Sequence, residues 1–354
     1  MRFLFMIQGE GRGHCTQAVA LKELIESRGH TVCHVAVGTN GARPLEMFRK
    51  EFGGITRIAS PSFGYIWGNR ISLIATVFNT VRNLGAYKAS LGAIGALLAQ
   101  HKPDAVINFY EPLYGVYQWL NRKSTGAHRS FSIGHQFMFH HPSYPRKHGK
   151  FLFQRWIVSW WTAVVGSCSR KIALSFYEAP DHGDIAVVPP ILRNRLFEVD
   201  ARRKDGDYIL AYVLNPGYAN EIKTSLRRTR EAPQVHVFCE RADEMDTEGL
   251  NIRFYALNGD RFLEQMAEAQ SVICTAGFES AAEARYLGKP LLMVPVRGHC
   301  EQFYNAIDAC NQGFGIYANR FSLERILRFR AADNRAYRVW VDSGKERLIK
   351  VLGL

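Results

Sequence analysis

The sequence predicts an α/β protein with two parallel-sheet domains. Short apolar runs alternate with helical stretches through both halves of the chain, and such alternation implies parallel strands covered by helices. At 354 residues, the chain is longer than one hydrophobic core usually supports. The alternation is interrupted at Val188-Pro189-Pro190, and a basic stretch follows. We therefore predict a first domain over residues 1–190 and a second domain over residues 191–335.

The individual strands and helices follow from the same pattern. In the first domain, the predicted strands span residues 2–7, 31–37, 55–59, 105–109, 130–133, 171–174 and 185–188, and the predicted helices span residues 14–28, 42–52, 71–101, 112–124 and 150–166. In the second domain, the predicted strands span residues 208–213, 234–239, 252–256, 271–275 and 291–296. The basic tail, residues 336–354, is predicted to be helical and to pack back onto the first domain.

Composition excludes several classes of protein. The chain is 47% hydrophobic and has no low-complexity tract, which indicates a fully folded protein. Its seven cysteines are scattered, without a Cys-x-x-Cys pair. This spacing favours neither a zinc site nor a disulfide framework, and it suits a reducing compartment such as the cytoplasm. The first apolar run is too short for a signal peptide, and no run of about 18 apolar residues predicts a transmembrane helix.

The net charge of +13 and the pI near 9.5 indicate anionic partners. Anionic small-molecule substrates and the surface of an anionic membrane are both compatible with this charge, whereas no nucleic-acid-binding motif accompanies it. Residues 71–98 and 151–165 are the most apolar segments. We expect each to form a helix with a buried face. The alternative is an aromatic and basic surface that rests on the inner face of the plasma membrane.

Residues 272–305 carry the most specific pattern in the chain. An apolar run from Val272 to Thr275 leads into a turn at Ala276-Gly277, and a helix carrying Glu279 and Glu283 follows. Gly288-Lys289-Pro290 then ends this helix. The small-residue turn leaves backbone N–H groups and the positive end of the helix available to an anion, and the carboxylates can accept hydrogen bonds from sugar hydroxyls. This pattern predicts a site for a nucleotide-sugar.

A glycine-rich turn, Gly-Glu-Gly-Arg-Gly-His at residues 9–14, follows the first strand and opens a helix. It is not a dinucleotide fingerprint, because His14 stands where the third glycine belongs. Nor is it a Walker A loop, because no Gly-Lys-Ser/Thr occurs. His14, on the first turn of the helix, could orient or deprotonate a hydroxyl. It could equally be a helix-start residue with a satisfied hydrogen bond.

Together, these two segments resemble glycosyltransferases of the GT-B architecture, in which two Rossmann-like domains face each other across a cleft. The similarity is greatest to the group that includes the lipid I N-acetylglucosaminyltransferase of peptidoglycan synthesis. That group combines a Gly-x-x-Gly-Gly-His or Gly-x-Gly-x-Gly-His turn with Ser/Thr-x-Gly, a helical Glu, Gly-x-Pro and Gln-x-x-Asn-Ala. Here the C-terminal motifs are Thr275-Ala276-Gly277, Glu283, Gly288-Lys289-Pro290 and residues 302–306.

The resemblance implies an enzyme that moves a sugar from a nucleotide-sugar, with a UDP-sugar expected, to a hydroxyl acceptor. Inversion at the sugar carbon and a role in cell-surface glycan or glycolipid synthesis are also implied. The expected donor-binding residues are Gly11, Gly13, Thr275, Ala276, Gly277, Phe278, Glu279, Glu283, Arg297, Glu301 and Gln302. The acceptor would be a sugar or a lipid-linked molecule, and no cofactor other than the donor is expected.

Three residues are candidates for the catalytic base: His14, Glu111 and His135. Glu111 follows a strand and precedes Pro112, so it either lies at the cleft or caps the next helix. We expect no metal, because Asp205-Gly206-Asp207, the one Asp-x-Asp match, precedes a strand and is interpreted as a surface turn. Two alternatives remain open at this point: a nucleotide-sugar 2-epimerase on the same architecture, and a protein that binds nucleotide-sugars without chemistry.

Overall fold

A computed structural model describes residues 1–40, 44–62, 65–66, 70–71, 73–123, 128–146, 151–202, 204, 206–213, 216–231 and 233–354. The chain divides into two compact units. Unit 1 comprises Met1–Ile66, Ile71–Arg193 and Val341–Leu354, and unit 2 comprises Trp67–Arg70 and Asn194–Trp340. Each unit is an α/β structure around a parallel sheet, which is the fold class that the alternating pattern predicts.

Unit 1 contains a seven-stranded sheet in the order β3-β2-β1-β6-β7-β8-β9, and the strand pairs within it are parallel. The strands are β1 (Arg2–Gln8), β2 (Thr31–Gly38), β3 (Ile55–Ile58), β6 (Ala105–Phe109), β7 (Arg129–Gly134), β8 (Arg170–Leu174) and β9 (Ile185–Val188). A separate two-stranded sheet pairs β4 (Tyr65–Ile66) with β5 (Arg70–Ile71). The central strands β1 and β6 are almost entirely buried, as apolar strands covered on both faces should be.

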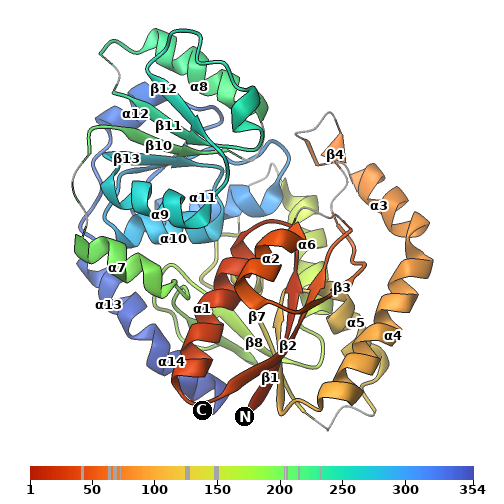
Figure 1. Ribbon diagram of the computed structural model, residues 1–354. Helices are drawn as coiled ribbons and strands as arrows, with labels where there is room; N and C mark the ends of the chain where they lie inside the picture. The colour runs from red at the N-terminus through yellow and green to blue at the C-terminus, as the bar shows by residue number, and fades with distance from the viewer. Residues whose placement is uncertain are drawn as a thin grey trace. The chain divides into compact units, whose positions relative to one another are not determined.

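Helices cover both faces of this sheet (Figure 1). They are α1 (Gly13–Ser27), α2 (Pro44–Phe52), α3 (Leu73–Arg82), α4 (Leu84–His101), α5 (Pro112–Leu120) and α6 (Leu152–Val165), with a short 3-10 helix η1 at His135–His140. On one face, Leu4 and Met6 of β1 pack against Ile94 of α4 and Leu113 of α5. From α4 the contacts continue to α5 and then to α6, so these three helices form one row.

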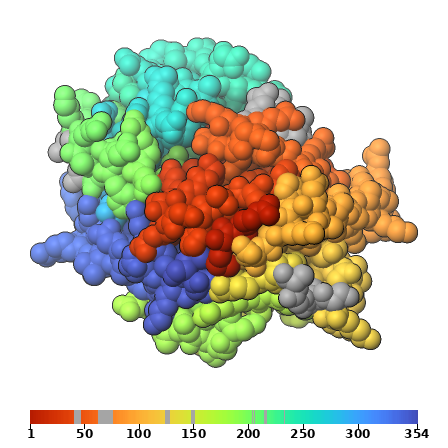
Figure 2. Space-filling model, turned by 60° about the horizontal axis from the view of Figure 1, so that its bottom comes forward, coloured from red at the N-terminus to blue at the C-terminus, as the bar shows by residue number. Residues whose placement is uncertain are grey.

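The C-terminal helix α14 (Gly344–Leu352) belongs to unit 1. Figure 2 shows the C-terminal residues, in blue, beside the red start of the chain. Glu346 forms an ion pair with Arg28 at the end of α1, and Arg347 forms one with Asp181 at 2.7 Å. The guanidinium of Arg347 also donates to the carbonyl of Val187 in β9. Helix α14 thus contacts both the edge strand β9 and the end of α1.

Unit 2 contains a six-stranded parallel sheet in the order β12-β11-β10-β13-β14-β15. The strands are β10 (Ile209–Tyr212), β11 (Val235–Phe238), β12 (Ile252–Tyr255), β13 (Ser271–Cys274), β14 (Leu291–Met293) and β15 (Ile316–Tyr317). The helices are α7 (Asn194–Arg202), α8 (Pro216–Arg228), α9 (Gly259–Glu268), α10 (Phe278–Tyr286), α11 (Cys300–Asn311), α12 (Leu323–Arg328) and α13 (Arg335–Asp342), and the 3-10 helix η3 spans Ala242–Glu244.

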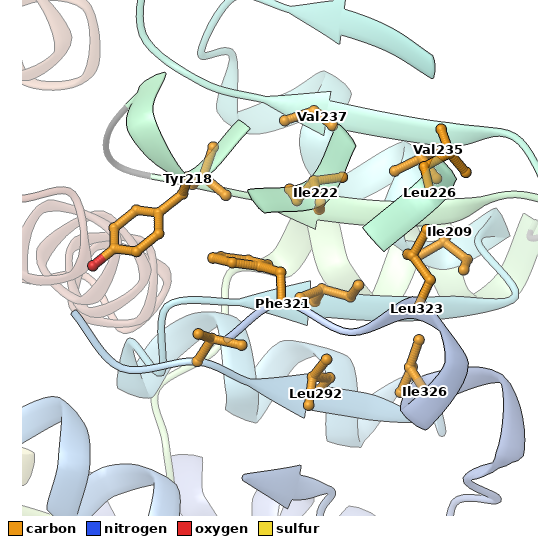
Figure 3. Close-up of a cluster of buried hydrophobic side chains, with 14 of the residues drawn as sticks. Ile209, Tyr218, Ile222, Leu226, Val235, Val237, Leu292, Phe321, Leu323 and Ile326 are labelled. Atoms are coloured by element: carbon orange, nitrogen blue, oxygen red, sulfur yellow. The ribbon is translucent and has the colours of Figure 1, made fainter. Parts of the chain in front are cut away.

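One hydrophobic cluster joins α8 and α12 to the sheet of unit 2. Figure 3 shows Ile222 of α8 and Ile326 of α12 in this cluster with strand residues such as Ile209 and Val237. Each of these side chains is at most 1% exposed. Burying a side chain of this size contributes roughly 1.5–3 kcal/mol of stability, so the sheet and its covering helices form a rigid base for the loops beyond the strands.

The structure differs from the sequence-based expectations in several elements, among them the short strands β4 and β5, which were not predicted. The stretch predicted as one helix over residues 71–101 is two helices, because the chain leaves helical geometry at Asn83, whose amide side chain donates to the carbonyl of Asn79. Strand β15 was not predicted, since two residues carry no alternation. Residues 152–165 form the expected helix, α6, with Thr162 and Val165 on its buried face, but four of its large apolar side chains are exposed: Leu152, Phe153, Trp156 and Trp160.

Candidate functional site

The loops at the carboxyl end of the sheet in unit 1 contain polar residues from distant parts of the sequence. Thr39 follows β2, Ser60 follows β3 closely, Tyr110 follows β6 and His135 follows β7. Because the strands are parallel, their carboxyl ends meet at the same edge of the sheet. Open parallel sheets bind their ligands at this edge, so we describe each residue there in turn.

The glycine-rich turn is shaped by close contact with the end of β2. The N–H of Gly9 donates to the carbonyl of Gly38 at 2.8 Å. A Cβ atom on Gly9 would lie 2.9 Å from that oxygen, so a larger residue cannot occupy this position without displacing the backbone. Gly11 has a φ of +92°, a conformation that glycine adopts without strain. Helix α1 then begins at Gly13 and places His14 in its first turn.

His14 lies against the aromatic ring of Tyr110. The two ring centroids are 5.8 Å apart and the planes differ by 14°, while Nδ1 of His14 lies 3.4 Å from the amide oxygen of Gln17. The imidazole is partly exposed. Loss of solvation nevertheless lowers the pKa of His14 below its usual 6.5. A neutral imidazole in a fixed orientation can accept a proton from a hydroxyl at neutral pH.

Tyr110 was not identified from the sequence, although it sets the position of His14. Its φ of +60° is unusual for a bulky residue, and such strained conformations cluster at functional sites. The phenolic oxygen lies 2.6 Å from the hydroxyl of Thr162 in α6, and the ring contacts Phe137 edge-on. The only signal for Tyr110 in the sequence was its position directly after the apolar run that forms β6.

Glu111 is fully buried and caps α5. Its carboxylate accepts the N–H of Leu113 at 3.0 Å and the hydroxyl of Ser60 at 2.9 Å. Burial raises the pKa of Glu111 to about 8, against the opposing effect of these hydrogen bonds. The sequence left open whether Glu111 lies at the cleft or caps the helix. The structure shows Glu111 as the cap of α5. The assignment of Glu111 as a catalytic base stays a prediction.

Glu111 fits only because residue 38 is glycine. A Cβ atom at Gly38 would lie 1.8 Å from Oε2 of Glu111. We expect Gly38→Ala to destabilise the protein by about 2–4 kcal/mol, because overpacking costs about 1–3 kcal/mol and loss of a cap costs about 1 kcal/mol. Urea unfolding measures the change. Gly54→Ala is the control, since a Cβ there has no neighbour within 4 Å; equal effects of both substitutions would contradict this account.

His135 lies in the interior of unit 1. It is 1% exposed, and its Nδ1 is 2.7 Å from the carbonyl oxygen of Leu174. Its ring contacts Tyr144 and Phe176. Burial lowers the pKa of His135 to about 4. These contacts make the residue part of the packing between η1 and β8. Its assignment as a base stays a prediction.

In unit 2, the turn after β13 has the geometry of an anion site. Thr275 and Ala276 are buried, and Ala276 has a φ of +59°, which is strained for a residue with a Cβ atom. The side-chain amide of Asn305 donates to the carbonyl of Ala276 at 3.4 Å. Helix α10 begins after Gly277, which provides no capping side chain. The first N–H groups of a helix have no acceptor within the helix, and an anion can bind there.

Both predicted carboxylates of α10 lie inside unit 2. Glu279 is 7% exposed and Glu283 is 3% exposed. Tyr337 of α13 is close to both: burial, reinforced by the charges of Glu279 and Glu283, raises the pKa of Tyr337 well above 10. Its hydroxyl donates to the carbonyl of Ala282. The two carboxylates are thus held by packing, and their assignment to the donor stays a prediction.

The loop between β14 and α11 is closed by its own side chains. His299 caps α11 by accepting the N–H of Gln302 at 3.4 Å, and Oε1 of Gln302 accepts the N–H of Val296 at 2.8 Å. Burial lowers the pKa of His299 to about 4, and a neutral ring is required for this cap. Arg297 forms an ion pair with Glu221 at 2.8 Å. His299 was not identified from the sequence; its place directly before a helix was the available signal.

No group of three or more His, Cys, Asp or Glu side chains able to hold a metal ion occurs among the residues that the structure describes. In the same part of the chain, no helix is long and apolar enough to cross a membrane. The histidine-rich segment at 135–148 contains His140 and His141, each bonded to a backbone carbonyl, of Ser159 and Pro180 respectively; His148 lies outside the described residues.

The two parallel-sheet units have the GT-B fold, as the solved structures of similar fold described below show. A sequence profile of glycosyl transferase family 1 matches residues 1–332. The chain belongs to that family, and the predicted resemblance and enzyme class are confirmed. No curated protein matches the sequence closely enough to count as a relative.

Solved structures of similar fold cover nearly the whole chain. The spinosyn forosaminyltransferase SpnP has a TM-score of 0.63 and 15% identity, with 100% of this chain and 98% of that chain covered. Phytolacca americana UGT2, complexed with UDP-2-fluoro-glucose and pterostilbene, has a TM-score of 0.64 and 14% identity, with 99% of each chain covered. Acinetobacter baumannii MurG has a TM-score of 0.57 and 15% identity, with 99% of each chain covered.

Proposed function

We propose that this glycosyltransferase transfers a sugar from a UDP-sugar to a hydroxyl acceptor, with inversion and without a bound metal. The observation that carries the proposal is the turn at Ala276-Gly277, which opens α10 and precedes the buried carboxylate of Glu283. A diphosphate would bind the N–H groups at the start of α10, and Glu283 would accept from the ribose hydroxyls. The UDP-2-fluoro-glucose bound to a protein of similar fold supports UDP as the carrier.

The chemistry needs one proton to be removed and one leaving group to be stabilised. His14 would take the proton of the acceptor hydroxyl as its oxygen attacks C1 of the sugar. The bond between C1 and the phosphate oxygen breaks, and UDP leaves with the electron pair. A single displacement of this kind inverts the configuration at C1. The dipoles at the start of α10 would stabilise the charge that develops on the diphosphate.

The remaining donor residues have narrower roles. Glu301 and Gln302, at the start of α11, would contact the transferred sugar. The hydrogen bond of Gln302 to Val296 keeps this part of the loop in place, so its amide nitrogen rather than its oxygen would contact the sugar. Gly11 and Gly13 would allow close approach of the donor to the backbone.

Thermal unfolding against a panel of nucleotides and nucleotide-sugars, with and without EDTA, tests the donor. A ligand at about 100 times its Kd adds about 2.7 kcal/mol of stability, which raises Tm by several degrees. We expect stabilisation by UDP or by one UDP-sugar, unchanged by EDTA. An effect that EDTA abolishes would contradict the metal-independent proposal. If no nucleotide shifted Tm, the assignment of the α10 turn would be wrong.

Replacing Glu283 with glutamine is expected to weaken UDP binding about 10- to 100-fold, because hydrogen bonds to a charged group are worth about 1.5–3 kcal/mol. Isothermal titration calorimetry with UDP measures this change. Glu324→Gln is the matched control, since Glu324 is an exposed carboxylate of the same unit. Equal Kd values for wild type and Glu283→Gln would remove Glu283 from the donor site.

The state of the cysteines bears on the compartment in which the enzyme acts. All seven cysteines are free, which suits a reducing compartment, and we propose that the enzyme acts in the cytoplasm. A sugar or lipid-linked hydroxyl in glycan or glycolipid synthesis is the proposed acceptor. Product analysis by mass spectrometry with candidate acceptors, after the donor is known, distinguishes these two classes.

A further inference from the structure

Asn108 is a fully buried polar residue in the central strand β6 of unit 1. Its side chain is 0% exposed, and the other four residues of the strand are apolar. Strands of parallel sheets that are covered on both faces are usually apolar throughout, and a buried amide costs free energy unless it is hydrogen-bonded. An asparagine at this position therefore needs an explanation, which its hydrogen bonds supply.

The side chain of Asn108 binds both backbone groups of Glu111. Its Oδ1 accepts the N–H of Glu111 at 2.7 Å, and its Nδ2 donates to the carbonyl oxygen of Glu111 at 3.2 Å. The same Nδ2 donates to the carbonyl oxygen of Val165, the last residue of α6, at 3.2 Å. The last carbonyls of a helix have no donor within the helix. Asn108 thus connects the turn after β6 to the end of α6.

These hydrogen bonds span Tyr110, which lies between Asn108 and Glu111 in a left-handed conformation with a φ of +60°. This conformation is unfavourable for a residue with a Cβ atom, and it persists only where the surroundings enforce it. Asn108 constrains the backbone on one side of the residue, while the hydroxyl of Thr162 lies 2.6 Å from the phenolic oxygen on the other. Helix α6 takes part at both points, through Val165 and Thr162.

The backbone around this turn is closely packed. A Cβ atom on Gly115, in the first turns of α5, would lie 2.3 Å from the carbonyl oxygen of Val164 and 2.7 Å from that of Val165. The helix that follows the turn therefore meets the end of α6 at backbone level. This close approach leaves Asn108 beside acceptors whose positions are fixed, so its amide can act as a rigid support.

We propose that Asn108 is a positioning residue for the catalytic base. It keeps Tyr110 in the left-handed conformation, and the ring of Tyr110 sets the plane of the His14 imidazole, whose centroid is 5.8 Å away. Without the amide of Asn108, the backbone at Tyr110 can relax to an ordinary conformation, which displaces the ring on which His14 rests. This role rests on the proposed function of His14 as the base, and it names what holds that base in its orientation.

A role in stability alone makes different predictions from a role in positioning. Both roles lower Tm when Asn108 is replaced, because a buried hydrogen-bonded amide is lost. Positioning also predicts that kcat falls while the Kd for UDP is unchanged, since the proposed diphosphate turn belongs to unit 2. It further predicts that replacing Asn108 has no additional effect on kcat once His14 is absent, because residues that act through one another are not additive.

Steady-state release of UDP by the full chain, with donor and acceptor saturating, tests these predictions. Asn108→Ala should lower kcat by about 10²-fold, the loss that a displacement of about 1 Å can cause. Asn108→Asp keeps an acceptor for the N–H of Glu111 and should lose only severalfold. In both variants, calorimetry should give a Kd for UDP within about twofold of wild type. In a His14→Ala background, Asn108→Ala should change kcat by less than about twofold.

The matched control is Gln118→Ala, which removes another buried amide of unit 1, hydrogen-bonded to the hydroxyl of Tyr114 at 2.6 Å. It should lower Tm and leave kcat within about twofold of wild type. Circular dichroism establishes folding, and Asn108→Asp carries the comparison if Asn108→Ala does not fold.

Three results would overturn the role of Asn108: normal kcat in a folded variant, UDP binding weakened in parallel with kcat, or a full further loss in the His14→Ala background. Wild-type protein that releases no UDP from any donor would overturn the proposed function itself, and this role with it.

Discussion

His14→Ala is expected to lower kcat by about 10²–10⁴-fold, the range that a general base contributes, while UDP binding changes little. The imidazole is positioned by Tyr110 and Gln17, and its lowered pKa keeps it neutral near pH 7. Alanine removes the proton acceptor but leaves the α10 turn intact. Steady-state release of UDP, with donor and acceptor saturating, measures the loss.

The control for this variant is His101→Ala, which removes an imidazole from the end of α4, where it stacks on His34. Its turnover should stay within about twofold of wild type. Tyr110→Phe provides a second comparison, because it keeps the ring beside His14 and loses the hydrogen bond to Thr162; we expect an intermediate loss. Normal turnover by a folded His14→Ala protein would remove His14 from the mechanism.

The fold could be predicted because most strands of the two large sheets contain a short apolar run, whereas the two-residue strands β4, β5 and β15 were not predicted. The observed β6 and β9 have the predicted bounds, and β1 and β2 extend one residue beyond them. The exposure of α6 could not be predicted in the same way. Its apolar residues are as hydrophobic as those of a buried helix, and the sequence does not show whether another element covers them.

Those parts of the candidate site that consist of consecutive residues could be predicted from the sequence, and the other parts could not. The turn before α1 and the turn before α10 each occupy a few consecutive residues, so their small side chains were visible as motifs. Gly38 ends β2, whereas Ser60 and Glu111 lie in the loops after β3 and β6. Parallel pairing of β1 with β2 and β6 and of β2 with β3 brings the three residues together. Nothing in the sequence indicates that the carboxylate of Glu111 occupies the position that a side chain at residue 38 would need.

Glu111→Gln is expected to change how stability depends on pH. In the folded protein Glu111 has a pKa of about 8, raised by burial from about 4.5. Between these values the native state retains a proton that the unfolded chain releases, so wild-type stability should fall as pH rises, by about 1.4 kcal/mol per unit. Glutamine does not ionise and can still accept from Leu113. From pH 5 to 8, the variant should therefore gain about 4 kcal/mol relative to wild type.

Urea unfolding at several pH values between 5 and 8 measures this difference. The lowered pKa values of His14, His135 and His299 act in the opposite direction, but they affect both proteins equally and cancel in the comparison. Glu324→Gln, at an exposed carboxylate, should leave the pH profile unchanged. Parallel stability curves for wild type and Glu111→Gln would show that Glu111 ionises normally.

The same pKa values separate two of the candidates for the base, His14 and Glu111. If Glu111 took the proton of the acceptor, kcat/KM would rise from pH 6.5 to 8.5, because most of this carboxyl is protonated at neutral pH. His14 is already neutral over that range, so its assignment predicts a flat profile. Glu111 is also fully buried and accepts a hydrogen bond from Ser60. A flat profile that is unchanged in Glu111→Gln would leave His14 as the base and Glu111 as the cap of α5.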